Sequence, residues 1–203
     1  CTWMFGRDLV NWNNNFTWAK WVTPSRDLIS AFKQEGDEVR FKESIVYYDC
    51  NWSNYYPSDN YPFMYKCRSA NSSIIKFRYA DVLLLKAEAL IMQDTPDLEG
   101  AADIIDEVRD RAKLGALPTS VRSNKNVLLN ALLKERRLEL AFEGQRWFDL
   151  VRLDKVEEVM NAVYAKDSGR KAQIYTFDKN SYRLPIPQSV IDANDKIHQN
   201  PGY

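Results

Sequence analysis

Apolar residues recur at helical spacing through the middle of the chain. Between residues 77 and 92 they occupy positions i, i+3, i+4 and i+7, and a second stripe of the same period runs from 98 to 112. This period predicts two amphipathic helices, each with one face buried against a neighbour. Asp94 or Thr95 should cap the start of the second helix, and Gly115 should follow its end.

Two further helices are expected beyond this pair. The third should begin at Ser123 or Asn124 and run to Glu143, because Gly144 tolerates the left-handed conformation found just past a helix end. The fourth should continue to about residue 165, with a break after its first turns. Four helices with short connections form two antiparallel hairpins, and such hairpins stack into solenoids. The sequence therefore predicts an all-α fold.

The regions that flank the helices have weaker periodicity. One short helix is expected near the start, with Thr23 as its N-cap, Pro24 at its first helical position and Gly36 at its end. Residues 40–48 are rich in aromatic and β-branched side chains, which predicts an extended segment. Residues 50–66 carry prolines among Asn, Ser and Asp, which is typical of a loop.

The end of the chain is expected to be irregular from residue 166 onward. Prolines make 183–187 extended, and 188–192 can form one helical turn. Because the composition changes near residue 67, we divide the chain into two regions. Residues 1–67 form an aromatic-rich and mostly irregular segment with one short helix, and residues 68–203 form a helical region with an extended C-terminal tail.

Acidic and arginine side chains concentrate where the third helix meets the fourth. The acids at 135, 139 and 143 have i, i+4 spacing, which places them on one face of a helix. They either form ion pairs that hold the corner together or act as a catalytic carboxylate pair with arginine electrophiles. We favour the structural interpretation, since arginine partners lower the pKa of a carboxyl group and remove its basicity. The expected ion-pair network comprises Glu135, Arg136, Arg137, Glu139, Glu143, Arg146, Asp149 and Arg152.

Composition excludes several classes of function. The 203-residue chain has no formal net charge and a pI near 6.8, so no basic surface for nucleic acid is expected. No apolar run is long enough to span a membrane, and no signal peptide is visible. Three cysteines and one histidine are too few to predict a zinc site, and we expect no metal and no cofactor. Cys50 and Cys67 either form a disulfide or remain two thiols. The residues after Cys1 do not form a polar tether, so we expect the natural start to lie upstream.

Sixteen of the 26 aromatic residues lie in residues 1–67, mixed with asparagines. Flat aromatic rings cover the C–H face of a sugar, and amide groups pair with its hydroxyls. The alternative is that these rings fill a core beneath the loops, the role we expect for Trp147 at the helix corner. The candidate ligand-binding residues are Trp12, Trp18, Trp21, Trp52, Asn13 and Asn54.

Five ordered motifs resemble the SusD/RagB family, the outer-membrane nutrient-binding lipoproteins of Bacteroidetes. They are RYADVLLLKAEAL at 78–90, VRDRA at 108–112, ERRLELAFEGQRWFDLVR at 135–152, LPIP at 184–187 and QNPGY at 199–203. The third motif is the most specific of the five. Their shared order covers the helical region and its tail, whereas the aromatic-rich segment matches only loosely.

The resemblance implies a fold and a role. The fold is all-α, with tetratricopeptide-like helical hairpins and long irregular loops, and this chain corresponds to about the C-terminal half. The other half would carry the signal peptide and a lipidated cysteine, which anchors the protein at the extracellular face of the outer membrane. The implied role is non-catalytic capture of an oligosaccharide or other nutrient for a SusC-like TonB-dependent transporter. The motifs are a structural signature, so they transfer no ligand residue.

Two other functions remain open from the residues themselves. One is a helical-repeat scaffold for protein–protein interaction that binds no sugar. The other is an α-helical glycoside hydrolase that uses two carboxyl groups among Glu135, Glu139, Glu143 and Asp149, which would need to face one open cleft about 5–10 Å apart.

Overall fold

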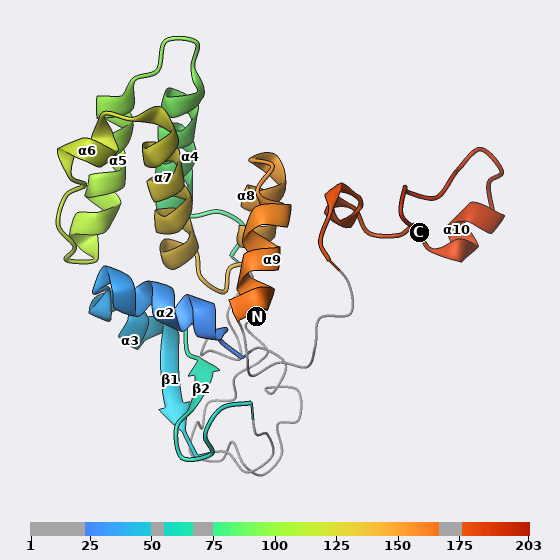
Figure 1. The fold of residues 1–203 in the computed structure, drawn as a ribbon, viewed down its shortest axis with the longest axis horizontal. Helices are drawn as coiled ribbons and strands as arrows, with labels where there is room; N and C mark the ends of the chain where they lie inside the picture. The colour runs from blue at the N-terminus through green and yellow to red at the C-terminus, as the bar shows by residue number, and fades with distance from the viewer. Residues whose placement is uncertain (1–22, 50–54, 67–74, 167–175) are drawn as a thin grey trace. The chain divides into compact units, whose positions relative to one another are not determined.

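The computed structural model divides the chain into two compact units, residues 1–146 and 147–203 (Figure 1). The residues that the structure describes are 23–49, 55–66, 75–166 and 176–203.

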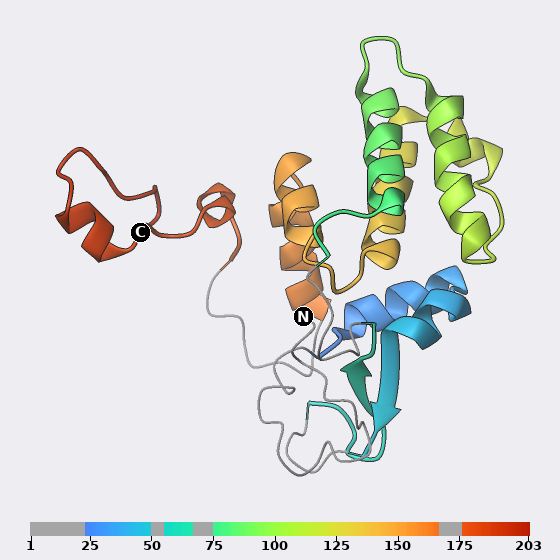
Figure 2. The same ribbon diagram turned by 180° about the vertical axis from the view of Figure 1, so that it is seen from behind.

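Three helices form the core of the first unit: α4 (Tyr79–Met92), α5 (Leu98–Arg111) and α7 (Lys125–Glu139) (Figures 1 and 2). A short helix, α6 (Thr119–Arg122), lies between α5 and α7 in sequence and was not predicted. The described residues are mostly helical, which confirms the all-α fold class. The buried side chains of this core are Leu84, Ala87, Ile91, Ala101, Ala102, Ile105, Val108, Leu128 and Leu132.

The starts of these helices follow from their caps. Asn124 caps α7 as predicted, because its side-chain oxygen accepts hydrogen bonds from two backbone N–H groups of the first turn. The predicted cap of α5 is wrong by two or three residues. Asp97, and not Asp94 or Thr95, accepts a hydrogen bond from the backbone N–H of Gly100 at 2.9 Å.

The end of α7 comes four residues earlier than predicted, at Glu139. Gly144 has the expected left-handed conformation, with φ of 81°, but Phe142 also has a positive φ of 67°. Phe142 packs against a second apolar cluster that includes Phe32 and Leu138. We infer that this packing ends the helix before the glycine, and that Glu143 therefore lies in the turn after α7.

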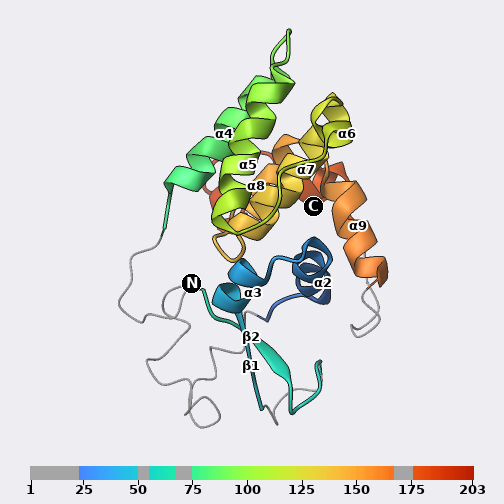
Figure 3. The same cartoon turned by 90° about the vertical axis from the view of Figure 1, so that its left-hand side faces the viewer.

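Two helices and a hairpin precede this core. Helix α2 (Arg26–Glu35) begins after Ser25, not Thr23, because the Ser25 hydroxyl accepts from the backbone N–H of Leu28. Gly36 ends it with φ of 70°, as expected. Figure 3 shows α2 beside the end of α7, where its apolar face meets the second cluster.

The prediction of an extended segment over 40–48 is wrong in its first half. Residues 40–44 belong to a second helix, α3 (Glu38–Ser44), whose N-cap Asp37 accepts from the backbone N–H of Arg40 at 3.1 Å. Only β1 (Ile45–Tyr48) is a strand, and it pairs antiparallel with β2 (Tyr61–Met64). The early region thus holds two helices where one was expected, and its division from the rest at residue 67 stays a prediction.

The second unit contains the larger part of α8 (Arg146–Arg152), then α9 (Val156–Lys166), a 3-10 turn η4 (Lys179–Tyr182) and α10 (Gln188–Asp192). The break after Arg152 and the helical turn at 188–192 are confirmed. Trp147, expected in the core, is only partly buried, and its ring centroid lies 6.3 Å from that of Phe177. Over the ranges that are described, every helix is too short or too polar to cross a membrane.

Candidate functional site

The predicted ligand-binding residues lie outside the described part of the chain, and so do Cys50 and Cys67. The structure therefore places none of them, and they remain predictions. They are Trp12, Asn13, Trp18, Trp21, Trp52 and Asn54.

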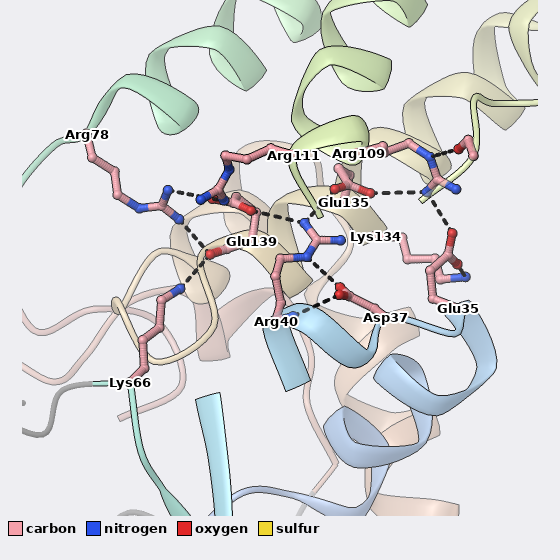
Figure 4. A network of polar contacts seen from close by, with 11 residues as sticks. Glu35, Asp37, Arg40, Lys66, Arg78, Arg109, Arg111, Lys134, Glu135 and Glu139 are labelled. Carbon is pink, nitrogen blue, oxygen red and sulfur yellow. Dashed lines mark hydrogen bonds and ion pairs between the residues drawn. The ribbon is translucent and has the colours of Figure 1, made fainter. Parts of the chain in front are cut away.

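The polar centre of the first unit is built around Glu139, the last residue of α7, whose side chain is 1% exposed (Figure 4). One of its carboxylate oxygens accepts from Arg78 Nη1 at 2.5 Å and from Arg111. The other accepts from Arg40 Nη1 at 3.1 Å. The three arginines that bind this buried carboxylate come from three helices. Arg40 belongs to α3, Arg78 immediately precedes α4, and Arg111 is the last residue of α5.

Glu135 lies one turn earlier on α7 and is equally buried. It accepts from Arg40 Nη1 at 2.6 Å and from Arg109 Nη1 at 3.3 Å. The same guanidinium groups continue the network outward, since Arg109 bonds Glu35 at 2.6 Å and Arg40 Nε bonds Asp37 at 2.5 Å. The network thereby joins α2, the cap of α3, α5 and α7.

Glu143, in the turn after α7, completes the network on its other side. Its two oxygens lie 2.7 Å from Arg78 Nε and 2.6 Å from Lys66 Nζ. Lys66 also donates to the backbone carbonyl of Glu139 at 2.6 Å, as does Arg78 Nη2. The turn that ends α7 is thus held by two bases from the segments that follow β2 and precede α4.

These partners differ from those expected within the corner. Arg136 pairs with Asp81 at 2.9 Å, Arg137 with Asp27 at 2.5 Å, and Arg146 donates to the carbonyl of Leu133 at 3.0 Å. In the second unit, Arg152 pairs with Asp149 at 2.9 Å, and both belong to the expected set. The bases that hold the buried acids come from distant parts of the sequence. Arg109 and Arg111 stand in the VRDRA motif, which was noted only as a family signature, and Arg40 was predicted to start an extended segment with no acidic partner assigned to it.

The two buried acids of α7 have opposite pKa shifts. Burial by itself would raise the pKa of Glu139, but the hydrogen bond and charge of Arg78, with Arg111 and Arg40, lower it to about 2. Burial raises the pKa of Glu135 above its ordinary value, because Arg40 and Arg109 only partly offset the loss of hydration. Arg40 is shared with Asp37 and Glu139, so it compensates Glu135 less than a dedicated partner would.

A pH dependence of stability follows from these shifts. Glu139 has a folded pKa of about 2 against an ordinary value of 4.5, so its stabilising effect is complete above pH 4.5 and is lost as the pH falls toward 2. Glu135 has the opposite effect on stability. Its pKa is raised in the folded state, so the folded state binds this proton at a higher pH than the unfolded state, and protonation of Glu135 stabilises the fold. The shift of Glu139 alone implies a loss of about 3 kcal/mol across this window, and we expect a smaller net loss because Glu135 offsets part of it. Urea unfolding followed by circular dichroism at a series of pH values measures this, and an unfolding free energy that rises on acidification would contradict it.

The chemistry available to these acids is limited. Glu139 is ionised far below neutral pH and accepts from three guanidinium groups, so it has little basicity and no proton to donate near pH 7. Glu135 is 2% exposed. This arrangement favours the structural interpretation of the network. Across the described ranges, no group of three or more His, Cys, Asp or Glu is placed to hold a metal ion.

A hollow of about 360 Å³ opens beside the network. Lys66, Arg78, Arg111, Glu139 and Glu143 line it, and the two glutamates are the least exposed of these side chains. Arg40, Glu43 and Ser44 of α3 form its other side. All of these residues belong to the first unit.

Comparison with known protein families gives a match over most of the chain. The model of the SusD family matches residues 58–203. A SusD-like protein, P2, of Formosa agariphila is 36% identical over 143 residues, which make up 67% of this chain and 27% of that relative.

Solved structures share the fold. A SusD superfamily protein from Bacteroides vulgatus aligns with a TM-score of 0.67 at 21% identity, over 89% of this chain and 44% of that one. A laminarin binding SusD-like protein aligns with a TM-score of 0.59 at 27% identity, over 89% of this chain and 38% of that one. The chain thus spans about a quarter of the P2 relative and less than half of these two structures.

Proposed function

Because the chain belongs to the SusD family, we propose that it is part of a non-catalytic glycan-binding protein of the bacterial cell surface. The bound oligosaccharide would pass to a SusC-like TonB-dependent transporter in the outer membrane, and a lipid anchor on another part of the polypeptide would hold the protein at the extracellular face. The observation that carries the proposal is the family match together with the fold shared with a laminarin binding relative.

The described end of the aromatic-rich segment adds a local observation. Tyr55 and Tyr56 contact each other edge to face, with ring centroids 4.9 Å apart, and the Arg26 guanidinium lies 4.0 Å and 4.6 Å from their two centroids. Tyr61 and Phe63 next to them are both 2% exposed. Part of the aromatic segment therefore fills a core, and we propose that recognition depends on Trp12, Trp18, Trp21 and Trp52, with Asn13 and Asn54 as polar partners.

Replacing Trp52 with Ala tests this proposal. If the indole stacks on a sugar ring, the loss of that contact should weaken oligosaccharide binding about tenfold, since ring contacts of this kind contribute about 1 kcal/mol or more. Calorimetric titration with laminarin oligosaccharides, repeated with other plant and algal glycans, measures the affinity. Tyr79→Ala is the control, because Tyr79 is an aromatic residue that is 72% exposed on α4. Equal weakening by both variants would count against the assignment of Trp52.

The competing function is a helical-repeat scaffold that binds a protein and no sugar. The outward face of α4 favours it, since Tyr79, Val82, Leu85 and Met92 are exposed there at helical spacing. A scaffold should retain its partner when the early tryptophans are replaced, and it should bind none of the glycans. That pair of results would reject the glycan-binding proposal.

A further inference from the structure

Four bases and three acids line the hollow beside Glu139, and the acids Glu139 and Glu143 are almost fully buried. We propose that the hollow receives an anionic substituent, a sulfate or a carboxylate, of an acidic saccharide. This inference rests on the proposed saccharide binding and adds a substrate class to it. The shared chemistry of the two substituents is an oxyanion attached to a sugar, and the ordered ion-pair network forms the rear wall of the site.

The acids and bases around the hollow differ in their access to solvent. The side chains of Glu139 and Glu143 are 1% and 3% exposed, whereas those of Arg78, Lys66 and Arg111 are 24%, 25% and 63% exposed. The two buried glutamates of the lining are thus less accessible than these three bases. A ligand in the hollow finds more exposed positive than negative surface among these five side chains, although the four bases and three acids of the whole lining nearly balance in formal charge.

Arg111 offers the most unused hydrogen-bonding capacity. A guanidinium has five N–H donors, and among the described residues Arg111 has one hydrogen-bond partner, Glu139. Its planar fork suits two oxygens of a sulfate or carboxylate. The hydrogen bond to Glu139 holds one nitrogen atom of Arg111 in place. A ligand therefore does not have to supply the full entropic cost of ordering this side chain.

Lys66 has a second property that an anion would complement. Burial is the largest influence on the pKa of Lys66 and lowers it, the nearby charge of Arg78 lowers it further, and Glu143 opposes both. An added negative charge would reverse part of this loss. The hollow, at about 360 Å³, has room for one substituted sugar unit.

One acidic group at the rim opposes the proposed ligand. Glu43 of α3 is exposed and lines the same hollow. Its charge should weaken the binding of an anion, and its removal should strengthen that binding. Removal of the Arg111 charge should therefore weaken anion binding, and removal of the Glu43 charge should strengthen it. A general loss of folding would not strengthen binding.

The test compares one glycan backbone with and without negative charge. Laminarin oligosaccharides and their chemically sulfated forms are titrated calorimetrically into the protein at low ionic strength, with oligogalacturonate as the carboxylate probe. We expect the sulfated form or the uronate to bind at least tenfold more tightly than the neutral form. The preference should fall as salt is added.

Variants assign this preference to the hollow. Arg111→Gln should weaken binding of the acidic probe about tenfold and leave the affinity for the neutral probe unchanged. Arg111→Lys should retain part of the preference for the acidic probe. Glu43→Gln should increase this preference a few-fold. Arg183→Gln, at an exposed arginine outside the hollow, is the matched control. Far-ultraviolet circular dichroism verifies that each variant is folded; if Arg111→Gln is not, Glu43→Gln carries the test.

The possible failures are distinguishable. Neutral and acidic probes of equal affinity, or a preference that survives Arg111→Gln unchanged, would overturn the inference and leave glycan binding intact. Inorganic sulfate that binds as tightly as the sulfated saccharide would reduce the hollow to a simple anion site and overturn the saccharide assignment. If no probe binds the unchanged protein, the proposed function fails and the inference fails with it.

Discussion

Glu139→Gln should lower the free energy of unfolding by about 3 kcal/mol or more. The substitution keeps the shape of the side chain but removes the charge that Arg40, Arg78 and Arg111 share. Arg40 is 8% exposed and cannot regain its hydration without opening the contact between α3 and α7. The loss should therefore approach the cost of leaving a buried charge with too few partners, which exceeds that of an exposed ion pair.

Urea unfolding at pH 7, followed by the helical circular dichroism signal, measures this loss. Glu107→Gln is the matched control, because Glu107 is exposed on α5 and should change the unfolding free energy by less than about 0.5 kcal/mol. The pH dependence should change too. The variant lacks the group with a pKa of about 2, so its stability should fall less on acidification. Similar small losses from both variants would show that the network adds little to stability.

The helices could be predicted from the sequence because their signals are local. Leu84, Ile105 and Leu132 belong to stripes with helical period. Asn124 caps the start of α7, and Gly36 ends α2. The errors occur where two local signals compete. Asp94, Thr95 and Asp97 are all acceptable caps in sequence, and we infer that the packing of α5 against α4 selects Asp97.

The partners of the buried acids could not be predicted, for a physical reason. Arg40 and Glu135 are 95 positions apart, and Arg78 and Glu139 are 61 apart. Helical spacing brings only residues three and four positions apart into contact, so it suggested partners within the corner. Long-range pairs depend on how α3, α4 and α5 meet the end of α7. Residues 40–44 were misplaced for a different reason: their strand-favouring side chains outweighed the Asp37 N-cap, which starts α3 and also bonds the Arg40 side chain.

Arg136→Met should also destabilise the first unit strongly, by about 3 kcal/mol. Arg136 and Asp81 join α7 to the first turn of α4, with side chains 2% and 4% exposed and 2.9 Å between Nη1 and Oδ1. Removal of the guanidinium leaves the Asp81 carboxylate buried without its partner, which is the costly half of breaking a buried ion pair. Urea unfolding of the single variant measures this cost.

The double variant Arg136→Met, Asp81→Leu separates the cost of a broken pair from the net contribution of an intact one. Apolar side chains of similar size lose no favourable hydration when they are buried. The free energy of unfolding of the double variant should therefore lie within about 1 kcal/mol of that of the unchanged protein. The remaining deficit would reflect the lost acid near the N-terminus of α4. A double variant as unstable as the sum of the single variants would show instead that the intact pair is strongly stabilising. Recovery would mean that the Arg136–Asp81 pair adds little net stability. The buried charges would then serve to fix the register in which α7 packs against α4.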